Sequence, residues 1–320
     1  MREHLKKYIE FSKTSNVRGL RILLEYFYAM EIFKPIFNSQ RRIVSIFGSA
    51  RTKPNKKEYH EARELGQLLF ENGYAVVTGG SSGIMQAANE GVASGIMDLM
   101  KRENPKLSEK NIRRSKSYKD YLKRYSVGLK ITLPFEPQHN PFVGVHATFH
   151  YFMVRKFFFG TLSSAFIACE GGWGTRDELF EMLTLVQTGK SPLMPIIYIS
   201  KDPKHLIDDI NHTIRKGYIS SKDRSLIDIV DNTKAALHII NQFYSVVKKI
   251  NYDKIHTIDM ELAKPLVESE KKELKKIIKT EYGKIFKGVS FSMGRMILTG
   301  FNYQSFSKKP CSLQSIPYGD

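Results

Sequence analysis

The sequence predicts an α/β fold with a mostly parallel sheet and helices on both of its faces. Short apolar runs rich in β-branched residues are closed by glycine turns, and each turn is followed by a stretch with helical apolar spacing. This order recurs along the chain. It is typical of parallel strands that are joined by crossover helices.

A helix is expected ahead of the sheet, because residues 20–30 carry apolar side chains at helical spacing. The acidic Glu25 and Glu31 argue against a helix that lies on an anionic membrane surface, so we expect it to pack on the main domain. The elements that follow are expected in this order: strand 43–47, helix 58–72, strand 75–78, helix 84–94 and strand 127–133.

A basic stretch at 96–126 interrupts this order and is expected to be an insertion with two short helices. Its cations are Lys101, Arg102, Lys106, Lys110, Arg113, Arg114, Lys116, Lys119, Lys123 and Arg124. Only Tyr118, Tyr121 and Tyr125 supply aromatic rings among them. Solvated surface charge is therefore the simpler interpretation than a nucleic-acid platform.

The second half continues the alternation and then changes character. We expect strand 165–169, helix 176–188, strand 195–199, helix 204–216 and helix 235–247. The tail predicts a strand at 254–262, an amphipathic helix at 268–286 and one or two strands at 288–301. The expected domains are an N-terminal helical segment 1–40, a main domain 41–248 and a C-terminal extension 249–320.

Composition narrows the class of protein. The 320 residues are 42% hydrophobic, which is enough for a core, and the formal charge of +18 favours an anionic partner. Cys169 and Cys311 are too few for a disulfide framework or a zinc site. Residues 157–169 form the longest apolar stretch, which is too short and too interrupted for a membrane span. A reduced, cytoplasmic protein without a membrane partner is expected.

Two glycine turns, 79–83 and 171–174, stand where a predicted strand ends and a predicted helix begins. The N–H groups at a helix start, together with the helix dipole, favour a bound phosphate. Neither turn has the dinucleotide spacing or a Walker lysine, so hydride transfer and ATP hydrolysis lose their usual support. Either turn alone could be a tight structural connection, whereas the pair favours a phosphate-bearing ligand.

The combination of motifs resembles the Lonely-guy (LOG) family over about residues 15–248. The motifs are Gly48-Ser49-Ala50-Arg51, Gly79-Gly80-x-x-Gly83-Ile84-Met85, Ser126-Val127-Gly128-Leu129, Leu133-Pro134-Phe135-Glu136, Val154-Arg155-Lys156 and Gly171-Gly172-x-Gly174-Thr175-x-x-Glu178. The resemblance implies a Rossmann-like fold and a homodimer. It also implies hydrolysis of a purine, pyrimidine or cytokinin-type nucleoside 5′-monophosphate to free base and ribose 5-phosphate. The tail resembles the β-α-β extension of longer bacterial members.

The resemblance also implies the site residues. Arg155 and Glu178 fall on the catalytic positions of the family, and Lys156 belongs to the same substrate-contacting pair. The remaining substrate-binding or phosphate-binding positions are Ser49, Gly79, Gly80, Gly83, Glu136, Gly171, Gly172, Gly174, Thr175 and Thr184. Glu178 is expected to stabilise positive charge on the ribose and to orient water, while Arg155 holds the phosphate or the hydroxyls. No metal or organic cofactor is expected.

Departures from the family pattern leave alternatives open. Glu170 stands where the family usually has proline, and Ser81-Ser82 replaces a Gly-Pro or Gly-Ser pair. A carboxylate beside a phosphate turn would repel the ligand unless it points away. One alternative is therefore a nucleotide-binding sensor of the same fold without turnover. The other is a nucleic-acid-binding protein, which charge alone suggests and which is less favoured.

Overall fold

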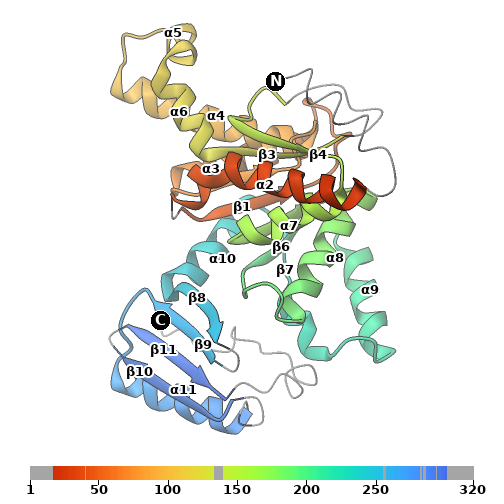
Figure 1. Cartoon of the computed structure of the whole chain (residues 1–320), viewed down its shortest axis with the longest axis vertical. Coiled ribbons are helices and arrows are strands. Elements are labelled where there is room, and N and C mark those ends of the chain that lie inside the picture. The colour runs from red at the N-terminus through yellow and green to blue at the C-terminus, as the bar shows by residue number, and fades with distance from the viewer. Residues whose placement is uncertain are drawn as a thin grey trace. The chain divides into compact units, whose positions relative to one another are not determined.

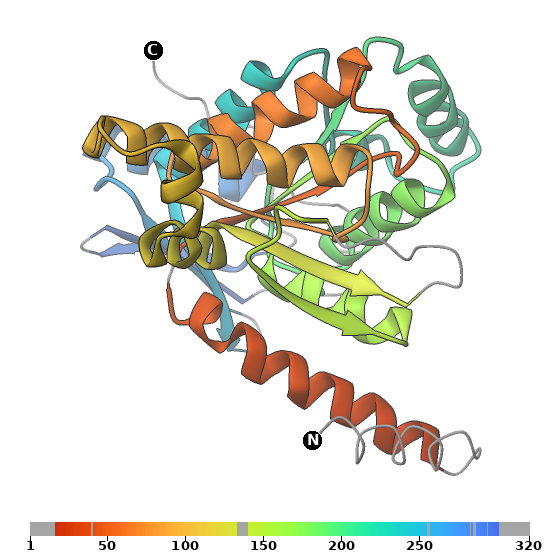
Figure 2. The ribbon, with the colours of Figure 1, turned by 90° about the horizontal axis from the view of Figure 1, so that it is seen from above.

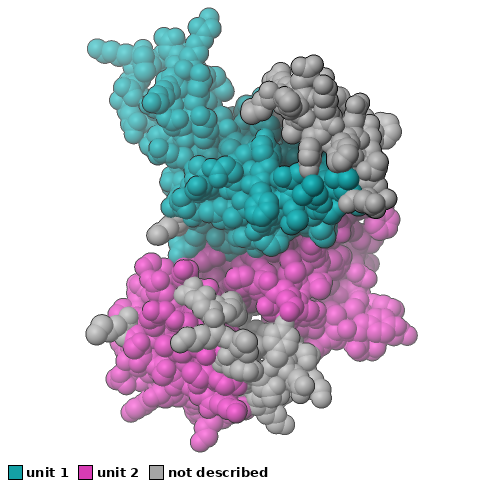
Figure 3. Space-filling view, viewed as in Figure 1, with its two compact units in different colours: residues 1–164 teal, residues 165–320 magenta. Residues whose placement is uncertain are grey.

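The computed structural model describes residues 17–39, 41–132, 140–254, 257–281, 283, 286–292 and 294–300 (Figure 1). The chain divides into two compact units, residues 1–164 and 165–320, which Figure 3 colours separately. Parallel strands alternate with helices in both units, so the predicted α/β fold with a mostly parallel sheet is confirmed. The domain boundaries at residues 41 and 249 stay a prediction.

Four parallel strands form the sheet of the first unit in the order β4-β3-β2-β1. They are β1 (Ile43–Phe47), β2 (Ala75–Thr78), β3 (Ser126–Ile131) and β4 (Val145–Phe149). Every residue of β1 and β2 is buried, which explains why these strands appear in the sequence as continuous apolar runs. The sequence does not predict β4. Only Ala147 and Phe149 of this strand are buried, so its apolar signal is weak.

The helices of the first unit are α2 (Arg18–Phe37), α3 (Lys57–Glu71), α4 (Ile84–Glu103), α5 (Glu109–Arg114), α6 (Lys116–Tyr125) and α7 (Phe152–Leu162). They follow the predicted order with two differences: α7 is not predicted by the sequence, and α4 continues past residue 94 to Glu103, so the first residues of the predicted insertion 96–126 belong to this helix. α5 and α6 are the two short helices expected in the basic stretch; they contact α4 and bury Ile112 and Tyr118. All of its cations except Lys101 are exposed, as expected for solvated surface charge.

The helix α2 packs on α7 and β4, beside which it lies in Figure 2. Ala29, Phe33 and Ile36 of α2 are buried. The rings of Phe33 and Phe158 lie 5.8 Å apart, which joins α2 to α7 through aromatic packing. The prediction of a helix packed on the main domain is confirmed, and the helix is longer than the predicted range.

The second unit carries three parallel strands in the order β5-β6-β7. They are β5 (Ala165–Cys169), β6 (Ile196–Ile199) and β7 (Asp228–Val230). The connecting elements are α8 (Trp173–Gln187), α9 (Lys204–Arg215), the short 3₁₀ helix η2 (Ser221–Leu226) and α10 (Thr233–Val246). The predicted strands and helices of this region are all present. β7 and η2 are additions that the sequence does not predict.

The C-terminal residues of the second unit form a separate antiparallel sheet in the order β10-β11-β9-β8. Its elements are β8 (Val247–Lys254), β9 (Thr257–Leu262), α11 (Glu268–Glu281), β10 (Gly288–Ser292) and β11 (Arg295–Thr299). Leu274 of α11 packs with Met260 and Leu298 in a core cluster of this sheet. The predicted strand-helix-strand order is present, and the two strands after α11 agree with the one or two that were expected. β8 is a further strand that the sequence does not predict. Among the described helices, none is long and apolar enough to cross a membrane.

Candidate active site

The first glycine turn joins β2 to α4 in the first unit. Gly83 has φ +67°, and a Cβ at this position would lie 2.2 Å from the Ser49 carbonyl oxygen, so only glycine fits. The Ile84 N–H donates to the same oxygen at 3.1 Å, and the Ser82 hydroxyl donates to the Ala50 carbonyl at 2.9 Å. The structure thus brings Ser49 and Gly83 together. Part of the helix start is already occupied by the protein's own backbone.

A buried polar network lies beneath this turn and is not predicted by the sequence. Asn89 of α4 accepts from the Thr78 hydroxyl at 2.7 Å and from the Asn140 amide at 2.9 Å, and it donates to the Ser126 hydroxyl at 2.8 Å. Thr78 also accepts from the Gly80 N–H at 3.0 Å. Buried polar groups that are all hydrogen-bonded fix one geometry. The network therefore holds the turn, β3 and residue 140 in register.

Arg155 and Lys156 lie in the first turns of α7 in the first unit. Arg155 is only 8% exposed, and its guanidinium carbon lies 5.0 Å from the Phe152 ring centroid and 5.8 Å from that of Phe159. Lys156 is half-buried. The aromatic faces attract the cation and limit where the guanidinium can point. A buried, oriented arginine is suited to a bidentate contact with an anion.

The second glycine turn precedes α8 in the second unit and has an open approach. A Cβ placed on Gly172 or Gly174 would meet no other described atom within 4 Å. Trp173 between them is 90% exposed, so no described side chain covers its ring. Gly171 directly precedes Gly172. Glu170 stands between Gly171 and the last residue of β5, Cys169. The N-terminus of α8 is thus accessible, in contrast to the occupied start of α4.

Thr175 and Glu178 share the buried face of α8. Thr175 is 7% exposed and Glu178 is 1% exposed, although Asp177 between them is exposed. Positions three apart lie on the same side of a helix, so the hydroxyl and the carboxylate are neighbours there. Thr184 is exposed, and its hydroxyl donates to the Phe180 carbonyl at 2.7 Å. The structure therefore does not put Thr184 on the face of Thr175 and Glu178.

Glu170 has a defined partner within the second unit. The Ser200 hydroxyl donates to its Oε1 at 2.6 Å, and the Asp202 N–H donates to the Ser200 hydroxyl at 3.1 Å. Ser200 is buried and follows β6, so the Glu170 carboxylate is held at the end of the neighbouring strand. Burial, followed by the nearby Glu170 charge, raises the pKa of Tyr198 on β6.

A cavity of about 500 Å³ in the first unit lies at the insertion. It is lined by Phe70, Glu71, Gly73, Leu99, Arg102, Tyr121 and Tyr125. None of the predicted site residues lines it, so it is separate from the two glycine turns. Glu136, predicted to contact substrate, lies outside the described residues.

Two family models match the chain in succession. A family described as "SLOG cluster4 family" matches residues 41–96, and one described as "possible lysine decarboxylase" matches residues 88–240. A solved molybdenum cofactor binding protein from Rippkaea orientalis covers 63% of this chain and 97% of its own, at 16% identity and a TM-score of 0.42.

Curated relatives cover the same region. A "bifunctional cytokinin biosynthesis protein" of Fusarium pseudograminearum is 24% identical over 72% of this chain. The matched region covers 47%, about half, of the length of that relative. A cytokinin riboside 5′-monophosphate phosphoribohydrolase of Arabidopsis thaliana is 28% identical over 63% of this chain and 84% of the relative. The protein of the same description from Oryza sativa is 28% identical over 58% of this chain and 67% of the relative.

Proposed function

The chain belongs to the LOG family, and on this premise we propose that it hydrolyses the N-glycosidic bond of a nucleoside 5′-monophosphate. The products are the free base and ribose 5-phosphate. Cytokinin-type nucleotides are the first substrates to test, because two relatives are named for them. Ordinary purine and pyrimidine monophosphates are the broader possibility.

The burial of two charged side chains carries this proposal. Glu178 is 1% exposed and Arg155 is 8% exposed, and both fall on the catalytic positions of the family motif. Removing a charge from water costs several kcal/mol unless it is compensated, so charged residues are almost never fully buried unless they are paired. Buried charged side chains are frequent in active sites, and this supports the assignment to catalysis.

The proposed reaction needs a carboxylate and water. The bond between ribose C1′ and the base nitrogen breaks, and its electron pair leaves with the base. Positive charge then develops on the ribose, which the Glu178 carboxylate stabilises. Glu178 also orients a water molecule and accepts a proton from it while the water oxygen bonds to C1′. That proton finally balances the charge on the released base.

Substrate binding is assigned to the groups that suit an anion. The open helix start at Gly172 and Gly174 offers N–H donors to the 5′-phosphate. Arg155 and Lys156 add positive charge for the phosphate or for the ribose hydroxyls. Binding energy from the phosphate, which does not react, then positions the sugar for attack.

Glu170 stands where the family usually has proline, and in the sequence this favours a sensor without turnover. The contacts of Glu170 in the structure weaken that argument. Its carboxylate accepts a hydrogen bond from Ser200 at 2.6 Å, beyond the end of β6. An anion at the start of α8 then faces a carboxylate that is already engaged. The proposal does not take up lysine decarboxylation, because the matching curated relatives in plants are named for phosphoribohydrolase chemistry.

Base release from a nucleotide panel tests the proposal. We expect the wild-type protein to liberate free base and ribose 5-phosphate from at least one monophosphate, with both products measured by chromatography. Glu178→Gln keeps the side-chain volume and should lower kcat by about 10²–10⁴-fold, because the carboxylate charge is lost. Asp177→Asn is the matched control, since this neighbouring carboxylate is exposed and should tolerate the change.

Equal trace release by the wild type and Glu178→Gln would reject the assignment. Binding of a monophosphate without any release would instead favour the sensor alternative. A homodimer and a cytoplasmic location are parts of the same proposal that the resemblance and the sequence support. Sedimentation measurements on the full chain would test the homodimer.

A further inference from the structure

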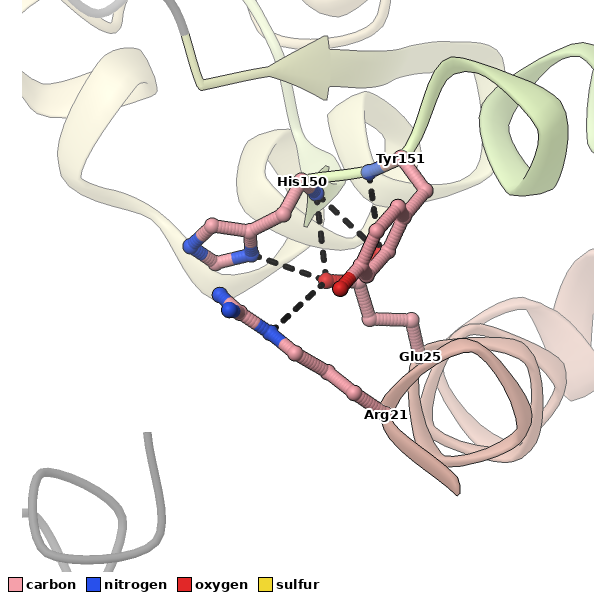
Figure 4. Close-up of polar contacts among 4 residues, drawn as sticks. All are labelled: Arg21, Glu25, His150 and Tyr151. Atoms are coloured by element: carbon pink, nitrogen blue, oxygen red, sulfur yellow. Dashed lines mark hydrogen bonds and ion pairs between the residues drawn. The ribbon is translucent and has the colours of Figure 1, made fainter. Parts of the chain in front are cut away.

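The Glu25 carboxylate of α2 accepts hydrogen bonds from His150 and Tyr151, the two residues that precede α7 (Figure 4). Glu25 accepts from the His150 N–H at 3.2 and 3.1 Å, from the Tyr151 N–H at 3.3 Å and from the His150 ring nitrogen Nδ1 at 2.8 Å. The Arg21 Nε lies 3.9 Å from the same carboxylate. The contact joins residues 125 positions apart in the chain.

This carboxylate serves as a cap that α7 lacks in its own sequence. Tyr151 is the N-cap residue of α7, and its side chain makes no capping hydrogen bond. N–H groups at a helix start have no partner within the helix, and a negative charge there is favoured by the helix dipole. The Glu25 side chain is 12% exposed, so most of its charge is compensated by these donors rather than by water.

The capped residue, Tyr151, is hydrogen-bonded directly to the backbone of Arg155. The Arg155 N–H donates to the carbonyl of Tyr151 at 3.3 Å, so the capped residue also fixes the backbone of Arg155. The Arg155 guanidinium lies over the ring of Phe152, the first residue of α7. A shift of the first turn would therefore move both the backbone and the aromatic face that orient the guanidinium.

We propose that Glu25 is a positioning residue that sets the direction of Arg155 by capping α7 from the N-terminal helix. This inference rests on the proposed function, in which Arg155 binds the monophosphate. It gives α2 a role in substrate binding, although α2 contributes none of the predicted substrate contacts. A 1 Å misplacement of a binding group can cost a large factor in rate, so such a contact matters to function.

The competing explanation is that Glu25 merely fastens α2 to the unit. α2 has independent anchors, since Ala29 and Phe33 are fully buried and Phe33 packs on Phe158. Loss of Glu25 should therefore leave α2 docked and disturb the start of α7. The two explanations differ in whether the effect of Glu25 depends on Arg155.

A double-mutant cycle on AMP, or on the panel nucleotide that the wild type prefers, separates them. Equilibrium binding is measured by calorimetry for Glu25→Ala, Arg155→Ala and the double variant of the full chain. We expect Glu25→Ala to weaken binding about tenfold in the wild-type background and to have no further effect when Arg155 is already alanine. Glu25→Gln keeps one acceptor oxygen and should fall between the wild type and Glu25→Ala.

The matched control is Glu31→Ala on the same helix. Glu31 has a side chain that is 78% exposed and pairs with the exposed Lys34 on the same helix, so its loss should leave binding unchanged. If Glu25→Ala does not fold, Glu25→Gln replaces it in the cycle.

Each remaining outcome decides the matter. An equal loss with and without Arg155, or no loss at all, would overturn the positioning role while the wild type still binds and hydrolyses its nucleotide. A wild-type protein that binds no monophosphate would reject the proposed function and this inference with it.

Discussion

Asp177 and Glu178 are adjacent carboxylates with opposite environments. In the sequence both are acids in the first turn of a helix, and either could simply complement the dipole. The phase of α8 separates them, because Glu178 is 1% exposed and Asp177 points to solvent. The motif identified the catalytic candidate by resemblance, and its burial supports the choice. Ser200 was not predicted, since no pattern in the sequence links it to Glu170.

Release of Glu170 should weaken monophosphate binding. In Ser200→Ala the carboxylate loses the hydroxyl that donates to it at 2.6 Å and becomes able to turn toward the start of α8. We expect the Kd for AMP to rise about threefold to tenfold, since like charges in a partly exposed site repel modestly. Titration calorimetry measures the change. Adding Glu170→Ala should restore binding, and an unchanged Kd in Ser200→Ala would contradict the expectation.

At the scale of elements, hydrogen bonds and ion pairs between helices fix how the helices are aligned, which apolar periodicity does not predict. Helices α3 and α4 are both predicted from their apolar spacing, but their alignment is not. The Tyr59 hydroxyl of α3 donates to Glu90 of α4 at 2.7 Å, and Arg63 Nε lies 3.3 Å from the same carboxylate. Burial, followed by the hydrogen bond to Glu90, raises the pKa of Tyr59 to about 12.

The pH dependence of stability in the alkaline range should reveal the contribution of the Tyr59–Glu90 hydrogen bond. Because the folded-state pKa of Tyr59 lies above the ordinary value of 10.0, its stabilising effect is complete below that pH and is lost as the pH rises toward 12. The free energy of unfolding of the wild type should therefore fall over this window more steeply than that of Tyr59→Phe, as measured by denaturant titration. Glu90→Gln should lower the pKa of Tyr59 in an ultraviolet titration. Identical slopes for wild type and Tyr59→Phe would contradict the assignment.

At the scale of the whole molecule, the charge of +18 invites an anionic partner but does not identify it. The basic insertion carries much of this charge on exposed side chains of α5 and α6. Ile112 of α5 and Tyr118 of α6 are buried and attach these two helices to the first unit. These features agree with a solvated face better than with a dedicated nucleic-acid platform.

Nucleic-acid binding should be weak and electrostatic only. We expect a single-stranded oligonucleotide to bind at low salt and to be released by about 0.15 M salt, because each phosphate contact contributes a slope of roughly −0.7 in log K against log salt. Fluorescence anisotropy measures the slope. Replacing Arg113 and Arg114 with alanine should make it shallower. Tight binding that persists above that salt concentration would favour the nucleic-acid alternative.

The sequence by itself determined the alternation of strands and helices, because apolar periodicity and glycine turns are local signals. Its six short motifs also resemble those of the LOG family, and the candidate residues follow from that resemblance. It missed β4, where burial alternates over a few residues, and β7, which has only three residues and none fully buried. It also missed α7 and β8.

Only the tertiary structure decided which groups meet. It put Glu25 against the start of α7, Asn89 beneath the first turn and Ser200 on Glu170. It also showed that the Ser49 carbonyl occupies part of the start of α4, while no described atom fills the space beside Gly172 and Gly174 at the start of α8. Contacts between residues far apart in the chain depend on the packing of whole elements, and no local pattern encodes that packing.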